Sequence, residues 1–164
     1  MTPEDLVEIE LIKQLKYKYM RCVDRKLWSE LSECFTGDAT CAYSGGKYAH
    51  EGRDAICAWL EGSMSADSFH SSHRVHHPEI QLTGPTTATG TWALEDTVIE
   101  TKLGFTLRGA AFYEDRYVKE DGSWKIEHTG YQRSYEEMQT RKDVPGLTLT
   151  ASAWSTGGRS VIDA

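Results

Sequence analysis

The sequence lacks the features that mark membrane-spanning, secreted and nucleic-acid-binding chains. No apolar run approaches the ~20 residues that a membrane-spanning helix requires, so we expect no membrane partner. The first five residues lack the charged-then-apolar pattern of a secretory signal, and we expect a cytoplasmic location. The net charge is −7 and no run of Lys or Arg forms a basic patch, so a phosphate backbone would be repelled. We therefore expect no nucleic-acid partner.

Cysteine is scarce, and its spacing excludes two common kinds of site. None of the 4 cysteines forms a Cys-x-x-Cys pair, which argues against a zinc ribbon or a thioredoxin-like site. Their neighbours are apolar or helical, so we expect reduced, buried thiols. The four residues are Cys22, Cys34, Cys41 and Cys57.

Length and aromatic content indicate one ordered globular domain. A chain of 164 residues is long enough to bury a core without disulfides or metals, and 5 Trp and 8 Tyr are not typical of a disordered chain. We expect a single domain over residues 1–140 and a C-terminal extension over residues 141–164, which is rich in Gly, Ser and Thr. The extension is either a mobile arm or a segment that docks on a neighbouring subunit.

The first half of the chain predicts helices. Residues 2–24 form one apolar stripe at three- and four-residue spacing, with Thr2 as a cap and Pro3 at the first helical position. Residues 27–35 predict a second, short helix that ends at residues 36–38, and residues 39–43 predict a short strand. A turn at residues 44–46 follows, and a third helix begins at residues 52–54.

The second half predicts four long strands. Segments 69–82, 87–101, 105–119 and 123–136 are rich in β-branched and aromatic residues, and turn signals separate them. Four successive strands favour an antiparallel meander, and helices followed by strands favour an α+β fold. We expect the sheet to curl, with the N-terminal helices over its concave face.

Asp96 interrupts an apolar strand face. Trp92, Leu94, Asp96 and Val98 share one face because side chains alternate along a strand. A buried carboxylate is costly unless a group pairs with it. Asp96 therefore either has a partner in a pocket or lies at the strand end in water beside Glu95.

Three histidines, at positions 73, 76 and 77, lie within five residues of the predicted strand from residue 69 to residue 82. His73 and His77 share a strand face with Val75, but lie about 13 Å apart on a strand and cannot share one ion, so we expect no metal. A His73–Asp96 pair across neighbouring strands would fix the imidazole tautomer and raise its basicity. The alternative for each histidine is a hydrogen-bonded residue at the pocket rim.

Two further positions are candidates for a site. Arg133 shares a strand face with Tyr131 and Tyr135, either as an anion clamp or as an edge arginine stacked on aromatics. Tyr19 belongs to the apolar stripe of the first helix. Asp24 lies about 140° round from Tyr19 and meets it only if the helix stops there; otherwise Asp24 is a helix-end acid.

Several stretches together resemble a known family. Residues 18–31 resemble the opening of the polyketide-cyclase-like (SnoaL-like) branch of the nuclear-transport-factor-like superfamily. Residues 76–80, 87–96, 109–117 and 127–133 then resemble, in order, bile-acid 7-alpha dehydratases, over about residues 9–140. The loop from residue 44 to residue 70 and the tail after residue 141 match weakly. Because those regions would shape the pocket mouth, the substrate could differ from that of the family.

The resemblance implies a curved mixed sheet closed into a cone by helices, and a homotrimer. It also implies loss of water from a hydroxylated, steroid-like enone, free or as its coenzyme A thioester, without a metal or organic cofactor. His73, oriented by Asp96, would move the proton from carbon, while Tyr19 would hydrogen-bond the enolate oxygen. Asp24 would orient groups near Tyr19, and Arg133 would hold charge or position Asp96. The active-site residues that it implies are Tyr19, Asp24, His73, Asp96 and Arg133.

Two other functions fit the same pattern. An isomerase or cyclase on the same fold would use the His–Asp pair but release no water. A non-catalytic module that binds an apolar ligand is also compatible with the fold, because such folds host many functions. The five polar residues argue against the binding module, since a pure binding pocket needs no paired acid and base.

Overall fold

Helix α1 leads the fold and carries the first two candidate residues. In the computed structural model, which describes residues 1–162, α1 spans Pro3–Arg25. It begins with a capping box, in which the Thr2 Oγ1 accepts the Asp5 N–H at 3.3 Å and the Asp5 carboxylate accepts the Thr2 N–H at 2.7 Å. It ends at Lys26, whose φ of 56° is left-handed and turns the chain. The predicted helix over residues 2–24 is confirmed.

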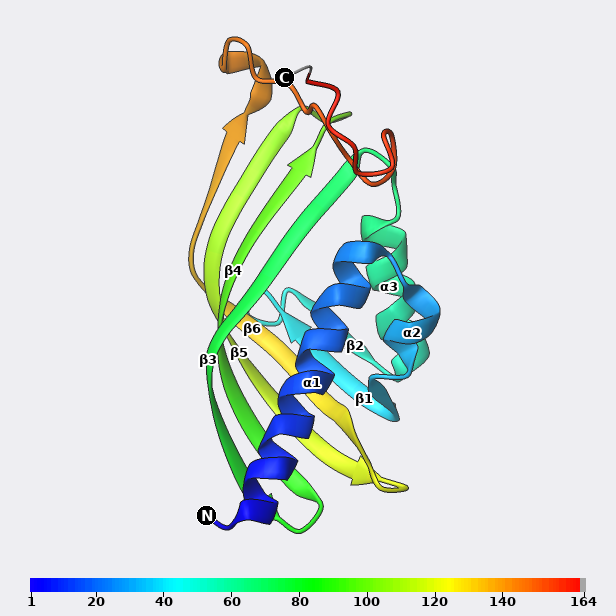
Figure 1. Cartoon of the computed structure of the whole chain (residues 1–164), viewed down its shortest axis with the longest axis vertical. Helices are drawn as coiled ribbons and strands as arrows, with labels where there is room; N and C mark the ends of the chain where they lie inside the picture. Colours follow the sequence, from blue (N-terminus) through cyan, green and yellow to red (C-terminus); the bar gives the residue numbers. More distant parts are fainter. Residues whose placement is uncertain (163–164) are drawn as a thin grey trace.

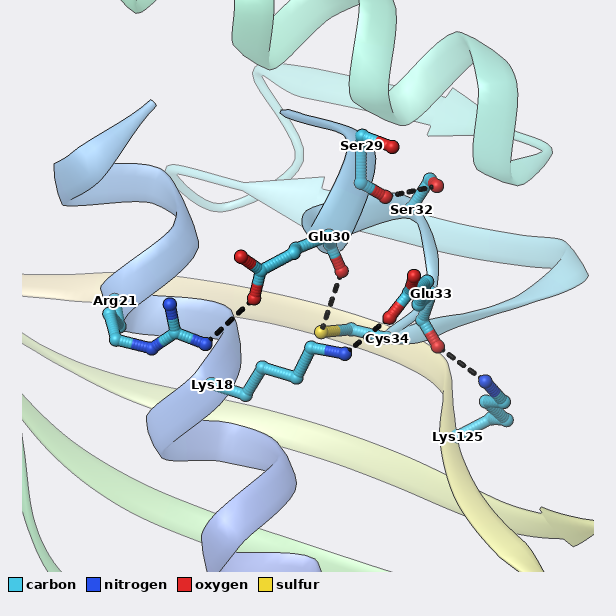
Figure 2. Close-up of polar contacts among 8 residues, drawn as sticks. All are labelled: Lys18, Arg21, Ser29, Glu30, Ser32, Glu33, Cys34 and Lys125. Carbon is cyan, nitrogen blue, oxygen red and sulfur yellow. Dashed lines mark hydrogen bonds and ion pairs between the residues drawn. The ribbon is translucent and has the colours of Figure 1, made fainter. Parts of the chain in front are cut away.

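Two shorter helices complete the helical layer. Helix α2 spans Trp28–Ser32 and α3 spans Arg53–Met64. Figure 2 shows α2 tied to α1 by ion pairs, Arg21 to Glu30 at 2.9 Å and Lys18 to Glu33 at 2.6 Å. Exposed pairs of this kind contribute little stability, so the fully buried Leu31 is the main anchor of α2. The second helix is shorter than predicted because the chain enters a strand at residue 35.

Six strands form one sheet in the order β2-β1-β6-β5-β4-β3. All neighbours are antiparallel except β1 and β6, which are parallel, so the predicted four-strand meander is confirmed within a mixed sheet. Residues 36–38, predicted to end a helix, lie in β1, and β2 was not predicted. The strands are β1 Phe35–Tyr43, β2 Tyr48–Glu51, β3 Phe69–Gly84, β4 Thr87–Glu100, β5 Phe105–Glu120 and β6 Ser123–Thr140.

The sheet curves around the helices, as Figure 1 shows, with α1 and α3 over its concave side. Helix α1 packs against β3 and β6, and α3 packs against β1. The fully buried Trp92 and Tyr117 of the sheet belong to the same hydrophobic core as Ile12 and Tyr19 of α1. The predicted α+β fold, a curved sheet covered by N-terminal helices, is confirmed.

The C-terminal segment crosses the open end of the cone. After β6 a short 3-10 helix, Arg141–Asp143, is followed by irregular chain that returns toward α3 and the end of α1 (Figure 1). There the Trp154 ring lies 4.2 Å from the Lys26 Nζ. The predicted extension, residues 141–164, is described as far as residue 162, and its last two residues lie outside the described part.

Two further features bear on the sequence predictions. All four cysteines are free, and three of them are buried, while Cys57 is half-buried. Among residues 1–162, neither α1, the longest helix, nor any shorter one has the uninterrupted apolar length that a bilayer span requires.

Candidate active site

Asp24 and His73 form a hydrogen-bonded pair between the end of α1 and strand β3. The Asp24 Oδ1 lies 2.7 Å from the His73 Nδ1, and the Asp24 Oδ2 accepts the His73 backbone N–H at 2.8 Å. The Ser71 hydroxyl donates to the Asp24 Oδ1 at 2.8 Å. Asp24 can reach β3 because it is the penultimate residue of a helix that packs along that strand. It is therefore more than the helix-end acid that the sequence left open.

The predicted partner of His73 was wrong. His73 and Asp96 are direct neighbours across β3 and β4, so the strands do bring them together. The Nδ1 of His73 nevertheless binds Asp24, because the Asp96 carboxylate is already bound by Arg133 of strand β6. The sequence pattern could place strands beside each other, but it could not show that the helix end reaches the same imidazole.

The Asp24 carboxylate decides which nitrogen of His73 carries the proton. Burial raises the pKa of Asp24, but the hydrogen bonds from His73 and Ser71 lower it more, and the net shift is downward. The carboxylate is thus ionised at neutral pH and can only accept. The Nδ1 must carry a hydrogen, which leaves the Nε2 lone pair free to act as a base.

Asp96 and Arg133 form the second polar pair of the site. The two guanidinium NH groups of Arg133 donate to the two carboxylate oxygens of Asp96, the Nη2 bond measuring 2.9 Å. Asp96 is 6% exposed. Of the two alternatives for Asp96, a buried acid with a partner and a strand-end acid in water, the structure therefore shows the first. Burial lowers the pKa of Arg133, but Asp96 raises it more, so the pair stays ionic.

Arg133 stacks on one of its two predicted tyrosine neighbours. Its guanidinium carbon lies 5.0 Å from the centre of the Tyr131 ring. Tyr135 was predicted to share this face, and that prediction was wrong. The register of β5 and β6 shifts by one residue at Ser134, which turns Tyr135 to the other face, where it is 58% exposed.

Gly109 provides the space in which Arg133 reaches Asp96. It lies opposite Asp96 on β5. A Cβ at this position would lie 2.7 Å from the Arg133 Nη1 and 3.0 Å from the Tyr135 carbonyl oxygen. The carbonyl belongs to the backbone of β6 and cannot move far, so the guanidinium would have to leave its position.

We expect Gly109→Ala to separate Arg133 from Asp96. Turnover should fall by about tenfold, and stability should fall by about 1–3 kcal/mol because of the overpacked contact. Steady-state kinetics and urea unfolding would measure both effects. Gly37→Ala on β1 is the control, since no atom lies within 4 Å of its added Cβ. Unchanged turnover in Gly109→Ala would show that the ion pair is not needed for activity.

A cluster of three tyrosines lines the same pocket as His73. The Tyr19 and Tyr43 hydroxyls are 2.9 Å apart, and the Tyr113 ring packs edge-on against Tyr19 with centroids 6.4 Å apart. Burial raises the pKa of all three phenols, so each stays neutral and can donate a hydrogen bond. Tyr43 and Tyr113 were not predicted as site residues. Their alternation with the buried Cys41 and Ala111 was the available signal.

These groups surround a cavity under α3. Its free volume is about 30 Å³, space for one or two water molecules. Of the five predicted site residues, Tyr19 and His73 line it, Asp24 supports His73, and the pair of Asp96 and Arg133 lies on the strands beside His73. The lining is otherwise apolar or aromatic: Met20, Val23, Tyr43, Trp59, Leu60, Met64, Tyr113 and Tyr131.

The histidine-rich part of β3 does not form a metal site in the described chain. No group of three or more His, Cys, Asp or Glu side chains among residues 1–162 is placed to hold a metal ion. His77 has a φ of 27°, and the pairing of β3 with β4 shifts between His76 and Glu79. The bulge interrupts the alternation that was expected to place His77 on the face of His73.

Comparison with known proteins agrees with this fold. The SnoaL-like domain model matches residues 4–130. A candidate scytalone dehydratase from Novosphingobium aromaticivorans is similar in structure, with a TM-score of 0.76 and 26% identity over 84% of this chain and 91% of that one. The LinA-type3 hexachlorocyclohexane dehydrochlorinase from Novosphingobium barchaimii has a TM-score of 0.74 and 15% identity over 90% and 97% of the two chains. The chain belongs to the SnoaL-like domain family.

Proposed function

We propose that this protein is a dehydratase that removes water from a hydroxylated, steroid-like enone by acid–base catalysis. The observation that carries the proposal is the Asp24–His73 pair, which holds an imidazole base at a cavity that the neutral tyrosines Tyr19, Tyr43 and Tyr113 also line. A base and hydrogen-bond donors around one cavity are what enolate formation requires.

Each group has a defined task in the elimination. The His73 Nε2 takes a proton from the carbon next to the one that bears the hydroxyl. The electron pair moves through the enone to its oxygen, where the hydroxyls of Tyr19, Tyr43 or Tyr113 stabilise the charge. The enolate then re-forms the carbonyl as the carbon–oxygen bond to the hydroxyl breaks. The His73 imidazolium returns its proton to the departing hydroxide, and water leaves.

The pocket walls support a flat, largely apolar substrate. Apart from His73 and the tyrosine hydroxyls, the lining is aliphatic, thioether and aromatic, and it includes Trp59 and Met64 of α3. Ligand pockets usually measure about 300–1,000 Å³, so a steroid-sized substrate could enter the cavity of about 30 Å³ only if its walls moved. Helix α3 contributes three of the lining side chains, Trp59, Leu60 and Met64.

Two of the similar structures carry names that are compatible with an elimination. One is named as a dehydratase and another as a dehydrochlorinase, and both names denote loss of a small molecule from a carbon skeleton. The bile-acid class of substrate rests on the sequence resemblance. Of the five residues that it implies, Tyr19 and His73 line this pocket, Asp24 holds His73, and Asp96 pairs with Arg133 on the strands beside His73.

Ultraviolet absorbance tests the proposed reaction directly. Purified protein should convert a 7-alpha-hydroxy-3-oxo-4-ene bile acid, or its coenzyme A ester, to a dienone whose absorption band lies at longer wavelength. The same steroid without the 7-hydroxyl is the control and should give no new band. Binding of the hydroxylated steroid without growth of the band would contradict the dehydratase. Movement of the double bond without release of water would identify an isomerase.

A further inference from the structure

A completely buried ion pair lies directly beneath the tyrosine cluster. The Lys16 Nζ is 2.6 Å from the Asp115 Oδ2, and both side chains are 0% exposed. Asp115 also accepts the Tyr117 hydroxyl at 2.6 Å and the Thr129 hydroxyl at 2.7 Å. The Trp92 indole N–H donates to the Tyr117 hydroxyl at 2.9 Å, which extends the network across β4 and β5.

Burial of this ion pair is energetically unfavourable compared with an apolar core. Burying two charges costs several kcal/mol for each ion, and apolar residues of similar volume are often equally or more stabilising. Burial holds the pKa of Lys16 below its ordinary value, and only the Asp115 carboxylate opposes that shift, so the ammonium depends on its partner. A charge held at this cost inside the core calls for a functional explanation.

The position of the ammonium supplies that explanation. The Lys16 Nζ lies 3.5 Å from the centre of the Tyr113 ring and 5.0 Å from that of Tyr19. Both tyrosines also line the cavity. A cation against the face of a phenol fixes the ring and draws electron density away from its oxygen, which makes the O–H a stronger donor. Lys16 precedes Tyr19 by three residues, so one face of α1 carries both.

We propose that Lys16, held by Asp115, is a positioning residue that fixes Tyr113 and Tyr19 and strengthens their hydrogen bonds to a negatively charged oxygen in the cavity. This inference rests on the proposed function, because the enolate is that oxygen. In this role Lys16 acts electrostatically through the two tyrosines, and it neither reacts with the substrate nor touches it. Asp115 contributes by keeping Lys16 charged and in place.

Two variants separate this role from simple packing. Lys16→Met removes the ammonium but leaves the Asp115 carboxylate without its cation, so it should lower the melting temperature. Lys16→Met with Asp115→Asn removes both charges and should recover most of that loss. In both variants we expect kcat to fall about tenfold, with KM changed by less than about twofold, because the interaction acts on developing charge. Lys13→Met is the control, because Lys13 is a half-buried lysine of the same helix that pairs with Glu10.

A second measurement works even if no turnover is found. A steroidal naphthol absorbs at longer wavelength when it ionises, so its spectrum in the cavity reports how well the site stabilises an oxyanion. The ratio of ionised to neutral bound naphthol should fall about tenfold in the double variant and stay unchanged in Lys13→Met. Failure of wild-type protein to turn over the enone would reject the dehydratase while leaving this ratio as the test of Lys16. A folded double variant with the wild-type ratio would overturn the inference, as would wild-type protein that binds only neutral naphthol.

Discussion

Replacing His73 with alanine is expected to lower kcat for enone dehydration by about 10²–10⁴-fold, the contribution of a positioned general acid–base. His73 is the titratable side chain that both lines the cavity and has one ring nitrogen committed to a carboxylate. The remaining nitrogen is the one placed to take the proton from carbon. Because the same nitrogen later returns that proton to the leaving hydroxyl, one substitution removes both steps.

The control for this variant lies three residues further along the same strand. His76 is exposed, and its Nε2 lies 3.7 Å from the Glu95 carboxylate, away from the cavity. His76→Ala should therefore keep kcat within about twofold of wild type. The growth of the dienone band measures both variants, and binding of the unreacted steroid confirms that the pocket is intact. A His73→Ala protein with wild-type turnover would remove His73 from the mechanism.

The overall fold could be predicted because local signals and the global arrangement agree. The capping residues around Thr2 mark the start of α1, and turn signals at residues 83–85, 102–104 and 120–122 separate strands that pair in sequence order. The strand β2 was missed because a four-residue edge strand that follows a glycine turn has little pattern of its own. Residues 36–38 carry turn-type side chains, yet they lie within β1, where its register with β6 shifts between Phe35 and Thr40.

The individual polar residues of the site could be predicted from the sequence, but the pairs that they form could not. The polar residues on apolar faces, such as Asp96, could be found because burial of a charge requires a partner. Which partner each charge takes depends on how α1 lies across the sheet, and no spacing within one element contains that information. The bulge at Ser134 is a similar case, since a single extra residue reverses the face of Tyr135 without any change in composition.

Asp24→Asn provides the sharpest test of the pairing that the structure adds. The Asp24 carboxylate accepts three hydrogen bonds, from the His73 backbone N–H, the His73 Nδ1 and the Ser71 hydroxyl. An amide keeps one accepting oxygen. If that oxygen serves the backbone N–H, the amide NH₂ faces the Nδ1 and forces the imidazole hydrogen to the Nε2, where a base is needed. The same exchange in a Ser-His-Asp triad lowers kcat about 10⁴-fold through the wrong tautomer.

We therefore expect Asp24→Asn to lower kcat by about 10²–10⁴-fold while the protein stays folded, since Asn matches Asp in size. Ser71→Ala is the matched control. It removes one donor to the same carboxylate without changing the imidazole tautomer, and should cost less than about tenfold. Asp96→Asn makes the opposite comparison, because Asp96 would be the orienting carboxylate if the partner inferred from the strand pattern were correct. A larger loss in Asp96→Asn than in Asp24→Asn would return that role to Asp96. A larger loss in Asp24→Asn would establish that Asp24, at the end of α1, orients the His73 imidazole, and that Asp96 on the neighbouring strand does not.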